Sequence, residues 1–194
     1  TVRKLGRGAD DSFRCHGDAP VHRVRGSSAA GAAHDTDLMA DIVDRATRSR
    51  MMSGIRSRNT KPERLIRSLL HSSGFRFRLH PSNVPGRPDI ALPKFRAAIH
   101  IHGCFWHGHD CSLFRMPSTR RQFWAEKIAR NQTRDREVIA ATLKLGWRHL
   151  TVWECAFRGP NQIGLETTAA RICDWIESRR RHAVIRSQEP RQRR

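Results

Sequence analysis

Ten consecutive residues, 102–111, hold six side chains that can ligate a metal ion, and no other feature of the sequence restricts the fold as strongly. Zinc prefers thiolates and imidazoles in a tetrahedral arrangement, and four such ligands form a closed structural site. Cys104, His109 and Cys111 can come from this one loop, and Cys155 can supply a fourth ligand from a later segment. A chance grouping of thiols and surface histidines is the alternative, and the spacing alone does not fix the ligands. We predict a structural zinc ion in this loop.

The number of cysteines favours metal binding over disulfides. The chain has five cysteines, an odd number, and disulfides are rare inside cells. Cys173 falls near the apolar face of the last predicted helix, where a small core residue is the better interpretation. We therefore expect reduced thiols and a cytoplasmic location.

The charge balance indicates an anionic partner. Lys and Arg number 37 against 18 Asp and Glu, a formal net charge of +19. Such an excess usually marks a nucleic-acid partner, and an anionic membrane surface is the alternative. Membrane binding would be favoured by a basic amphipathic helix with a continuous apolar face, and the sequence shows no such pattern. No apolar run reaches the roughly 18–20 residues of a membrane span, and no secretory signal is expected. We expect nucleic acid as the partner and no membrane association.

Charge and apolar residues are unevenly distributed along the chain. Residues 1–38 carry six basic and five acidic residues without apolar periodicity, which predicts a disordered extension. Residues 178–194 carry seven Arg and one Glu, which predicts a flexible basic arm that attracts phosphates regardless of sequence. Residues 39–177 keep +12 of the total charge and are predicted to be the folded domain, with Met39 as a candidate natural start.

The apolar spacing within 39–177 predicts a mixed α/β fold. Residues 60–63 have the form of a capping box and begin a helix that ends near Gly74. Strands are expected at 75–79, 89–92, 95–101 and 147–153, with the second and third paired as an antiparallel hairpin. Further helices are expected at 118–146, with or without a break near Asn131, and at 161–177. This order predicts a mixed β-sheet flanked by helices.

A single carboxylate begins the first strand of this hairpin. Hairpin geometry brings Asp89 near the end of the second strand, and strand alternation sends His100 and His102 to one face. Asp89, phosphate oxygens and a main-chain carbonyl can bind Mg²⁺, and a nearby histidine can take a proton from the attacking water. An aspartate at a strand start is more often a turn residue, however, and Glu63 is more often a helix cap. Both interpretations stay open on spacing alone.

Aromatic and basic residues alternate in two places. Phe105 and Trp106 lie inside the predicted metal loop, which would hold them rigidly. Trp124 shares a predicted helix with Arg120, Arg121 and Lys127. An exposed aromatic side chain can wedge between base pairs, which is easier at a mismatch. The equally weighted alternative is that Trp124 belongs to the core.

Several short strings together resemble the very-short-patch mismatch repair endonucleases of bacteria. They are Met39-Ala40-Asp41, Ala46-Thr47-Arg48-Ser49, Pro85-Gly86-Arg87-Pro88-Asp89, His102-Gly103-Cys104-Phe105-Trp106-His107, Phe123-Trp124, Glu126-Lys127-Ile128, Asn131, Arg134-Asp135, Gly146-Trp147-Arg148 and Val152-Trp153-Glu154-Cys155. The resemblance runs from about residue 39 to about residue 159, and the string around Cys104 is the most specific.

The resemblance implies a fold and an activity. The family has a restriction-endonuclease-like core with a structural zinc and uses Mg²⁺. It nicks the strand that carries the T of a T:G mismatch, on the 5′ side of that T, where 5-methylcytosine has been deaminated. Double-stranded DNA with a T:G mismatch would be the substrate, downstream repair proteins would follow, and the enzyme would be a monomer in the bacterial cytoplasm, associated with the nucleoid.

Residue roles carried over by position are also implied. Asp89 and the backbone carbonyl of Ile101 would hold Mg²⁺, and His107 would activate water. The active site would be supported by His102, Glu63 and Asp135. The zinc ligands would be Cys104, His109, Cys111 and Cys155. Phe105, Trp106 and Trp124 would insert beside the mismatch, with Met52 entering from the other groove.

One departure and two competing hypotheses accompany this resemblance. The family often has Thr at the position of Ile101, and a carbonyl ligand tolerates that side-chain change. The first competing hypothesis is a zinc-stabilised DNA-binding module without catalysis. The second is non-selective binding of nucleic acid by a basic protein, which predicts equal affinity for matched DNA and a steep salt dependence.

Overall fold

The computed structural model describes residues 46–47, 50 and 58–188. The predicted extension 1–38, the candidate start Met39 and the wedge residue Met52 lie outside the described residues. Within the described part, no helix is both long and apolar enough to cross a membrane.

A four-stranded mixed sheet forms the centre of the fold, in the order β1-β2-β3-β4. Strand β1 (Ile90–Leu92) pairs antiparallel with β2 (Ala97–His102) through a short 3-10 turn, η1 (Pro93–Phe95). Strand β3 (Arg148–Trp153) and strand β4 (His182–Ile185) continue the sheet in parallel. The predicted mixed α/β class and the antiparallel hairpin are confirmed.

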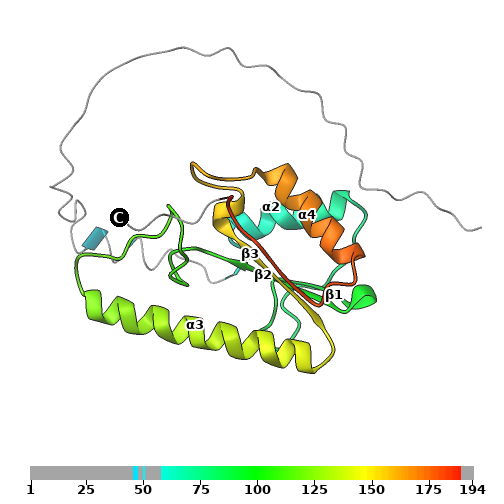
Figure 1. The fold of residues 1–194 in the computed structure, drawn as a ribbon, viewed down its shortest axis with the longest axis horizontal. Coiled ribbons are helices and arrows are strands. Elements are labelled where there is room, and N and C mark those ends of the chain that lie inside the picture. The colour runs from blue at the N-terminus through cyan, green and yellow to red at the C-terminus, as the bar shows by residue number, and fades with distance from the viewer. Residues whose placement is uncertain (1–45, 48–49, 51–57, 189–194) are drawn as a thin grey trace, which may run out of the picture. The chain divides into compact units, whose positions relative to one another are not determined.

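Helices cover both faces of this sheet (Figure 1). Helices α2 (Lys61–Ser72) and α4 (Leu165–Glu177) lie on one face, and the long α3 (Arg121–Lys144) lies on the other. A second 3-10 turn, η2 (Glu154–Ala156), follows β3. The predicted capping box is present, because the Thr60 side chain accepts from the Glu63 amide while the Glu63 side chain accepts from the Thr60 amide.

The hydrophobic core lies between the sheet and the α2/α4 pair. Strand alternation places the apolar residues of β2 and β3 on this face, where they meet the apolar stripes of both helices. Members of the core include Ile66, Leu70, Ile99, Leu150, Val152, Ile172, Trp175 and Ile176. Cys173 is also buried in it, as predicted.

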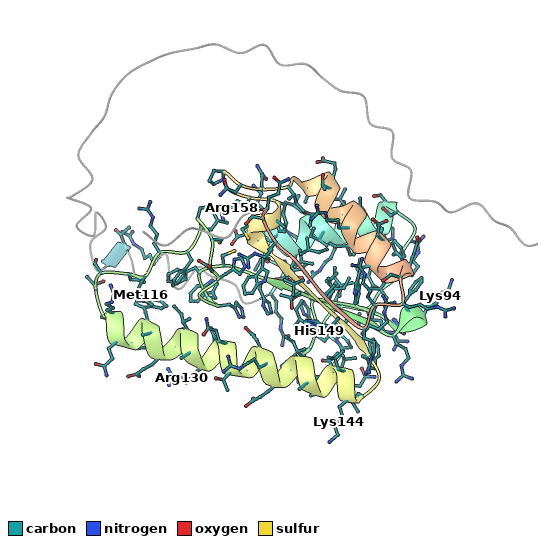
Figure 2. All side chains as sticks on the ribbon, viewed as in Figure 1. Lys94, Met116, Arg130, Lys144, His149 and Arg158 are labelled. Atoms are coloured by element: carbon teal, nitrogen blue, oxygen red, sulfur yellow. The ribbon has the colours of Figure 1, made fainter. Side chains whose placement is uncertain are left out.

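The opposite face of the same strands is polar. It carries His100, His102 and His149, and α3 buries only Ile128 and Thr142 of its own residues. In Figure 2, His149 lies among the side chains between the sheet and α3, whereas Lys144 extends away from the sheet. Because α3 packs only sparsely, a cleft remains between this helix and the sheet.

Two sequence-based expectations about these elements were wrong, and one open alternative was decided. The segment 75–79 is no strand and contributes only an isolated bridge between Arg78 and Ala91. The sequence left open whether the helix breaks near Asn131, and α3 runs through this residue without a break. The arm predicted at 178–194 contains β4, because Ala183, Val184 and Ile185 supply three strand-forming or apolar residues amid the arginines and pair with β3.

Candidate active site

The cleft between α3 and the sheet has a volume of about 840 Å³ and gathers most of the residues singled out above. Its acidic lining residues are Glu63, Asp89, Asp135 and Glu154, and its basic ones are Arg58, Arg87, Lys127 and Arg134. The lining also includes five histidines and two aromatic residues: His80, His100, His102, His107, His149, Phe105 and Trp106. A cleft with carboxylates inside and basic side chains around them suits a phosphodiester substrate.

Asp89 lies beside the end of β2, as hairpin geometry predicts. Its Oδ2 accepts a hydrogen bond of 2.7 Å from the Ile101 amide, and its Oδ1 lies 3.8 Å from His80 Nδ1. Burial raises the pKa of Asp89 to about 6, against the lowering effect of the Ile101 amide. A half-buried carboxylate that is costly to ionise alone gains stability from a bound cation, so Asp89 and the adjacent main chain fit a divalent metal ion.

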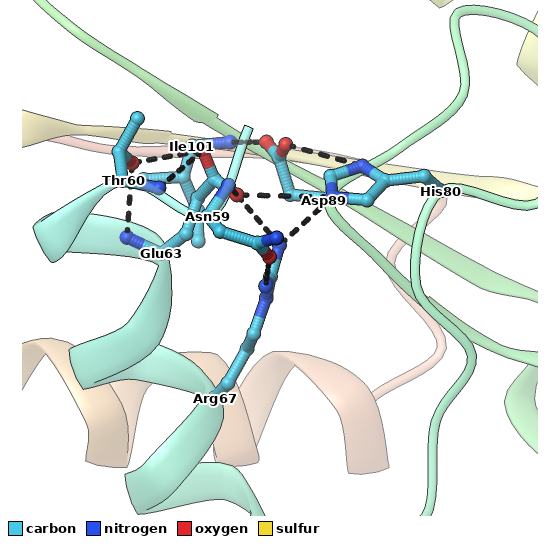
Figure 3. A network of polar contacts seen from close by, with 7 residues as sticks. All are labelled: Asn59, Thr60, Glu63, Arg67, His80, Asp89 and Ile101. Atoms are coloured by element: carbon cyan, nitrogen blue, oxygen red, sulfur yellow. Dashed lines mark hydrogen bonds and ion pairs between the residues drawn. The ribbon is translucent and has the colours of Figure 1, made fainter. Parts of the chain in front are cut away.

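Glu63 has two functions in the structure (Figure 3). It caps α2, since its Oε1 lies 2.8 Å from Thr60 Oγ1, and it also forms a 2.6 Å ion pair with Arg67. Only 3% of Glu63 is exposed. The capping interpretation is therefore correct, and the same carboxylate also lies within 4.8 Å of the ligand atoms of His80 and Asp89.

A second cluster joins the metal loop to α3. His107 Nδ1 lies 2.5 Å from Asp135 Oδ2, and the His102 and His107 rings stack with centroids 4.0 Å apart and planes 3° apart. His102 Nδ1 is 4.0 Å from the same Asp135 oxygen. A carboxylate on Nδ1 leaves Nε2 of His107 as the nitrogen that can accept a proton.

The loop that carries His107 is anchored to α3 by polar side chains. Asn131 donates to the Trp106 carbonyl at 2.7 Å, and Gln132 donates to the His107 carbonyl at 2.9 Å. These two amides come from the middle of α3, where the structure shows no break. Helix α3 therefore fixes the position of His107 relative to the sheet.

Gly108 limits how this loop can be changed. It has a φ of +59°, and a Cβ there would lie 2.5 Å from Cγ2 of the buried Ile128. We predict that Gly108→Ala lowers the free energy of unfolding by about 2–4 kcal/mol, from left-handed strain plus overpacking, and slows any reaction that needs His107. Urea unfolding measures the first effect. Gly146→Ala is the control, because Gly146 has a similar φ of +72° but faces the flexible Arg96 side chain; equal losses would contradict the packing argument.

Two buried histidines stack between the sheet and the cleft and have shifted pKa values. His100 and His149 stack with centroids 4.9 Å apart. Burial lowers the pKa of His100 to about 4, with the Asp135 charge opposing it and His107 adding to it. Burial, with His100 and His182, lowers the pKa of His149 to about 3. Both rings are therefore neutral in the folded protein at neutral pH.

We predict a loss of stability as the pH falls from 6.5 towards 4. The unfolded histidines take up protons near pH 6.5 while the folded ones do not, so each lowers the free energy of unfolding by about 1.4 kcal/mol per pH unit. Urea unfolding at pH 7.5 and pH 5 measures this slope, and His149→Leu should reduce it. The matched control is His71→Leu at an exposed position. If both variants keep the full slope, proton competition for the thiol cluster explains the acid sensitivity instead.

The four predicted zinc ligands converge. The ligand atoms of Cys104, His109, Cys111 and Cys155 all lie within 4.8 Å of one another, and all four residues are buried. His109 Nδ1 is 3.5 Å from Cys155 Sγ, and the His109 ring stacks on Trp153 with centroids 4.0 Å apart. Three sulfurs and one imidazole are a donor set that suits zinc.

The electrostatics of the thiols also fit a cation. A hydrogen bond from Cys104 lowers the pKa of Cys155, and the same contact raises the pKa of Cys104. Burial raises the pKa of Cys111. Buried thiols that cannot all ionise alone are stabilised as thiolates by a divalent ion.

The three aromatic residues expected at the mismatch, Phe105, Trp106 and Trp124, form one cluster outside the hydrophobic core. Trp124 lies 5.1 Å from Phe105 and 6.1 Å from Trp106, measured between ring centroids. Lys127 Nζ lies 5.4 Å from the Trp106 ring and 5.7 Å from the Trp124 ring. Trp124 is half-buried and belongs to neither core cluster, so the core alternative for this residue is wrong.

Sequence reasoning missed two residues of the site. Arg67 stands four positions after Glu63 on α2, a spacing that indicates an ion pair. His80 lies in the loop after α2, and no spacing rule connects it to Asp89. Arg67 and His80 meet each other only through the tertiary fold (Figure 3).

Comparison with known proteins places the chain in a family. The family model for DNA mismatch endonuclease Vsr matches residues 40–113, which include Asp89 and the loop 102–111. DNA mismatch endonuclease Vsr of Escherichia coli (strain K12) is 47% identical over 138 residues, 71% of this chain and 88% of the relative. Type II nicking enzyme V.XorIIP of Xanthomonas oryzae is 46% identical over 117 residues, 60% of this chain and 86% of the relative. Type II nicking enzyme V.NmeAIP of Neisseria meningitidis is 41% identical over 120 residues, 62% and 86% respectively. The chain therefore belongs to the Vsr family of DNA mismatch endonucleases.

Proposed function

We propose that the protein is a DNA mismatch endonuclease that nicks one strand of a duplex, 5′ of the T in a T:G mismatch, by Mg²⁺-dependent hydrolysis. The names of its relatives, a mismatch endonuclease and several nicking enzymes, support the reaction class. The single observation that carries the proposal is the convergence of Asp89, His107 and Asp135 on one cleft rimmed by basic side chains.

Each residue has a distinct task in this mechanism. Asp89 and the Ile101 carbonyl would hold Mg²⁺, which supplies Lewis-acid stabilisation of the charge on the phosphate. His107 takes the proton of the attacking water at Nε2 as the new P–O bond forms. The scissile P–O bond breaks, and the leaving 3′ oxygen takes a proton from solvent water. Asp135 orients His107 through Nδ1 and stabilises the imidazolium. His102 supports the site by stacking on His107, and Glu63 supports it through its ion pair with Arg67.

The remaining assignments complete the proposal. Zinc bound by Cys104, His109, Cys111 and Cys155 would be structural, because four protein ligands leave no open position. The sheet, with a carboxylate at the start of β1, would be a restriction-endonuclease-like core. We assign 1–38 to an extension, and we extend the endonuclease domain, predicted as 39–177, through β4, because this strand belongs to its sheet. We place the protein as a monomer in the cytoplasm at the nucleoid, acting on double-stranded DNA ahead of other repair proteins.

A nicking assay tests the function. The protein is incubated with duplexes that carry a T:G mismatch in a panel of flanking sequences, and with matched duplexes, with and without Mg²⁺. A single nick that requires both the mismatch and Mg²⁺ is expected. Mismatch-selective binding without any cleavage would support the DNA-binding module, and equal binding of matched DNA would support non-selective binding.

The aromatic cluster predicts how the mismatch is selected. Base stacking on an aromatic side chain contributes about 1–3 kcal/mol per base. We therefore expect Trp124→Ala to weaken T:G binding about tenfold and matched binding far less, measured by fluorescence anisotropy. Phe157→Ala is the comparison, since Phe157 packs on the hydrophobic core and should affect stability instead. Equal losses for mismatched and matched DNA in Trp124→Ala would contradict the insertion role.

A further inference from the structure

His80 lies between the two carboxylates of the site. Its Nε2 is 3.8 Å from Glu63 Oε2, and its Nδ1 is 3.8 Å from Asp89 Oδ1. Its amide donates to the Pro88 carbonyl at 3.1 Å, which closes the loop next to Asp89. Its backbone has a φ of +47°, a conformation that a residue with a Cβ adopts only when its surroundings impose it. The fold therefore holds this imidazole in place despite an unfavourable backbone conformation.

Arg67 determines which ring nitrogen of His80 carries the proton. Arg67 Nη2 lies 3.0 Å from His80 Nε2 and 2.6 Å from Glu63 Oε2 (Figure 3). A guanidinium only donates, so Nε2 must accept and the ring proton must sit on Nδ1. The Nδ1–H group therefore faces Asp89 Oδ1.

The same three side chains also have the spacing of a metal site. Ligand atoms of Glu63, His80 and Asp89 lie within 4.8 Å of one another. Arg67, however, already occupies one Glu63 oxygen and the free lone pair of His80, and it adds a fixed positive charge. A second cation would have to displace this guanidinium from a site where Arg67 is itself buried. The geometry favours Arg67 as the resident cation of this cluster.

We propose that His80 is a positioning residue: held by Arg67 at Nε2, it directs Nδ1–H at Asp89 Oδ1 and fixes the orientation of the carboxylate that binds the catalytic metal ion. The 3.8 Å separation is longer than a hydrogen bond, and such contacts often tighten only in the loaded site. Asp89 is thus held from both sides, by the Ile101 amide at Oδ2 and by His80 at Oδ1. This inference rests on the proposed metal binding by Asp89.

Two substitutions separate positioning from direct ligation. His80→Leu keeps bulk but removes both polar contacts. His80→Gln removes the imidazole but keeps one donor and one acceptor on a neutral group. Mn²⁺ is titrated into the full chain bound to a T:G duplex with a non-hydrolysable linkage, and free Mn²⁺ is followed by its EPR signal. Loss of an outer partner of a metal ligand typically costs 10–100-fold in affinity, so we expect about a tenfold weaker affinity in His80→Leu and near wild-type affinity in His80→Gln.

Each outcome decides the role of His80. Wild-type Mn²⁺ affinity in His80→Leu would overturn the proposal, and a loss in His80→Gln as large as in His80→Leu would show that the imidazole itself is needed. Asp89→Asn is the reference variant. If Asp89→Asn binds Mn²⁺ with wild-type affinity, the proposed metal site is wrong. If Asp89→Asn loses Mn²⁺ affinity while His80→Leu keeps it, only the positioning role is refuted. Zinc content and duplex binding without Mn²⁺ verify that each variant is folded.

Discussion

Replacing Asp89 by asparagine is expected to abolish nicking while leaving mismatch binding intact. Asparagine is isosteric and can still accept the hydrogen bond from the Ile101 amide, so the hairpin should not move. It lacks the negative charge that holds a hard cation. We expect the single-turnover nicking rate to fall on the order of 10³-fold or more, which corresponds to about 4 kcal/mol of barrier. Gel analysis of a labelled T:G duplex at saturating enzyme measures this rate.

The matched control for this substitution is Asp174→Asn on α4. Asp174 lies on the exposed side of a helix that covers the opposite face of the sheet, so its loss should leave the rate unchanged. Mismatch affinity in both variants is measured without Mg²⁺. Persistent nicking in Asp89→Asn would show that Asp89 does not hold the metal ion.

Replacing Cys155 by serine is expected to release the zinc and destabilise the fold. Cys155 follows β3 in η2, whereas the other three predicted ligands come from the loop after β2, so the ion would join two segments far apart in sequence. Metal binding in such a site is part of the folding free energy. We therefore expect a loss well beyond the about 1–3 kcal/mol of an ordinary substitution, together with loss of stoichiometric zinc.

Cys173→Ala provides the control, because Cys173 is equally buried but lies on α4 outside the thiol cluster. It should keep one zinc per chain and cost about 1–2 kcal/mol. Zinc is measured by elemental analysis of the purified protein, and stability by urea unfolding. A full zinc complement in Cys155→Ser would show that the fourth ligand is wrong.

The sequence predicted elements whose signals are local. The capping box at Thr60 and Glu63, the hairpin register that brings Asp89 to Ile101, and the thiol spacing all depend on neighbours along the chain or across one turn. Strand β4 was not predicted, because the arginine-rich composition around three apolar or strand-forming residues indicated a flexible arm. Its pairing with β3 stabilises this strand.

The parts of the site that could not be predicted depend on packing between distant segments. His107 meets Asp135 across 28 positions because α3 crosses the loop at Asn131 and Gln132. The family resemblance implied that both residues belong to the site, but neither it nor the spacing predicted their contact. His80 reaches Asp89 because its loop closes on Pro88 in a left-handed backbone conformation that no propensity predicts.

The alternation along β2 has a consequence for the evolution of this enzyme. One strand of six residues supplies core side chains such as Ile99 on one face and His102 on the other. A one-residue insertion or deletion inside it would exchange the faces of all later positions. Folding and chemistry would then fail together, so we expect β2 to tolerate substitutions but not the gain or loss of a single residue.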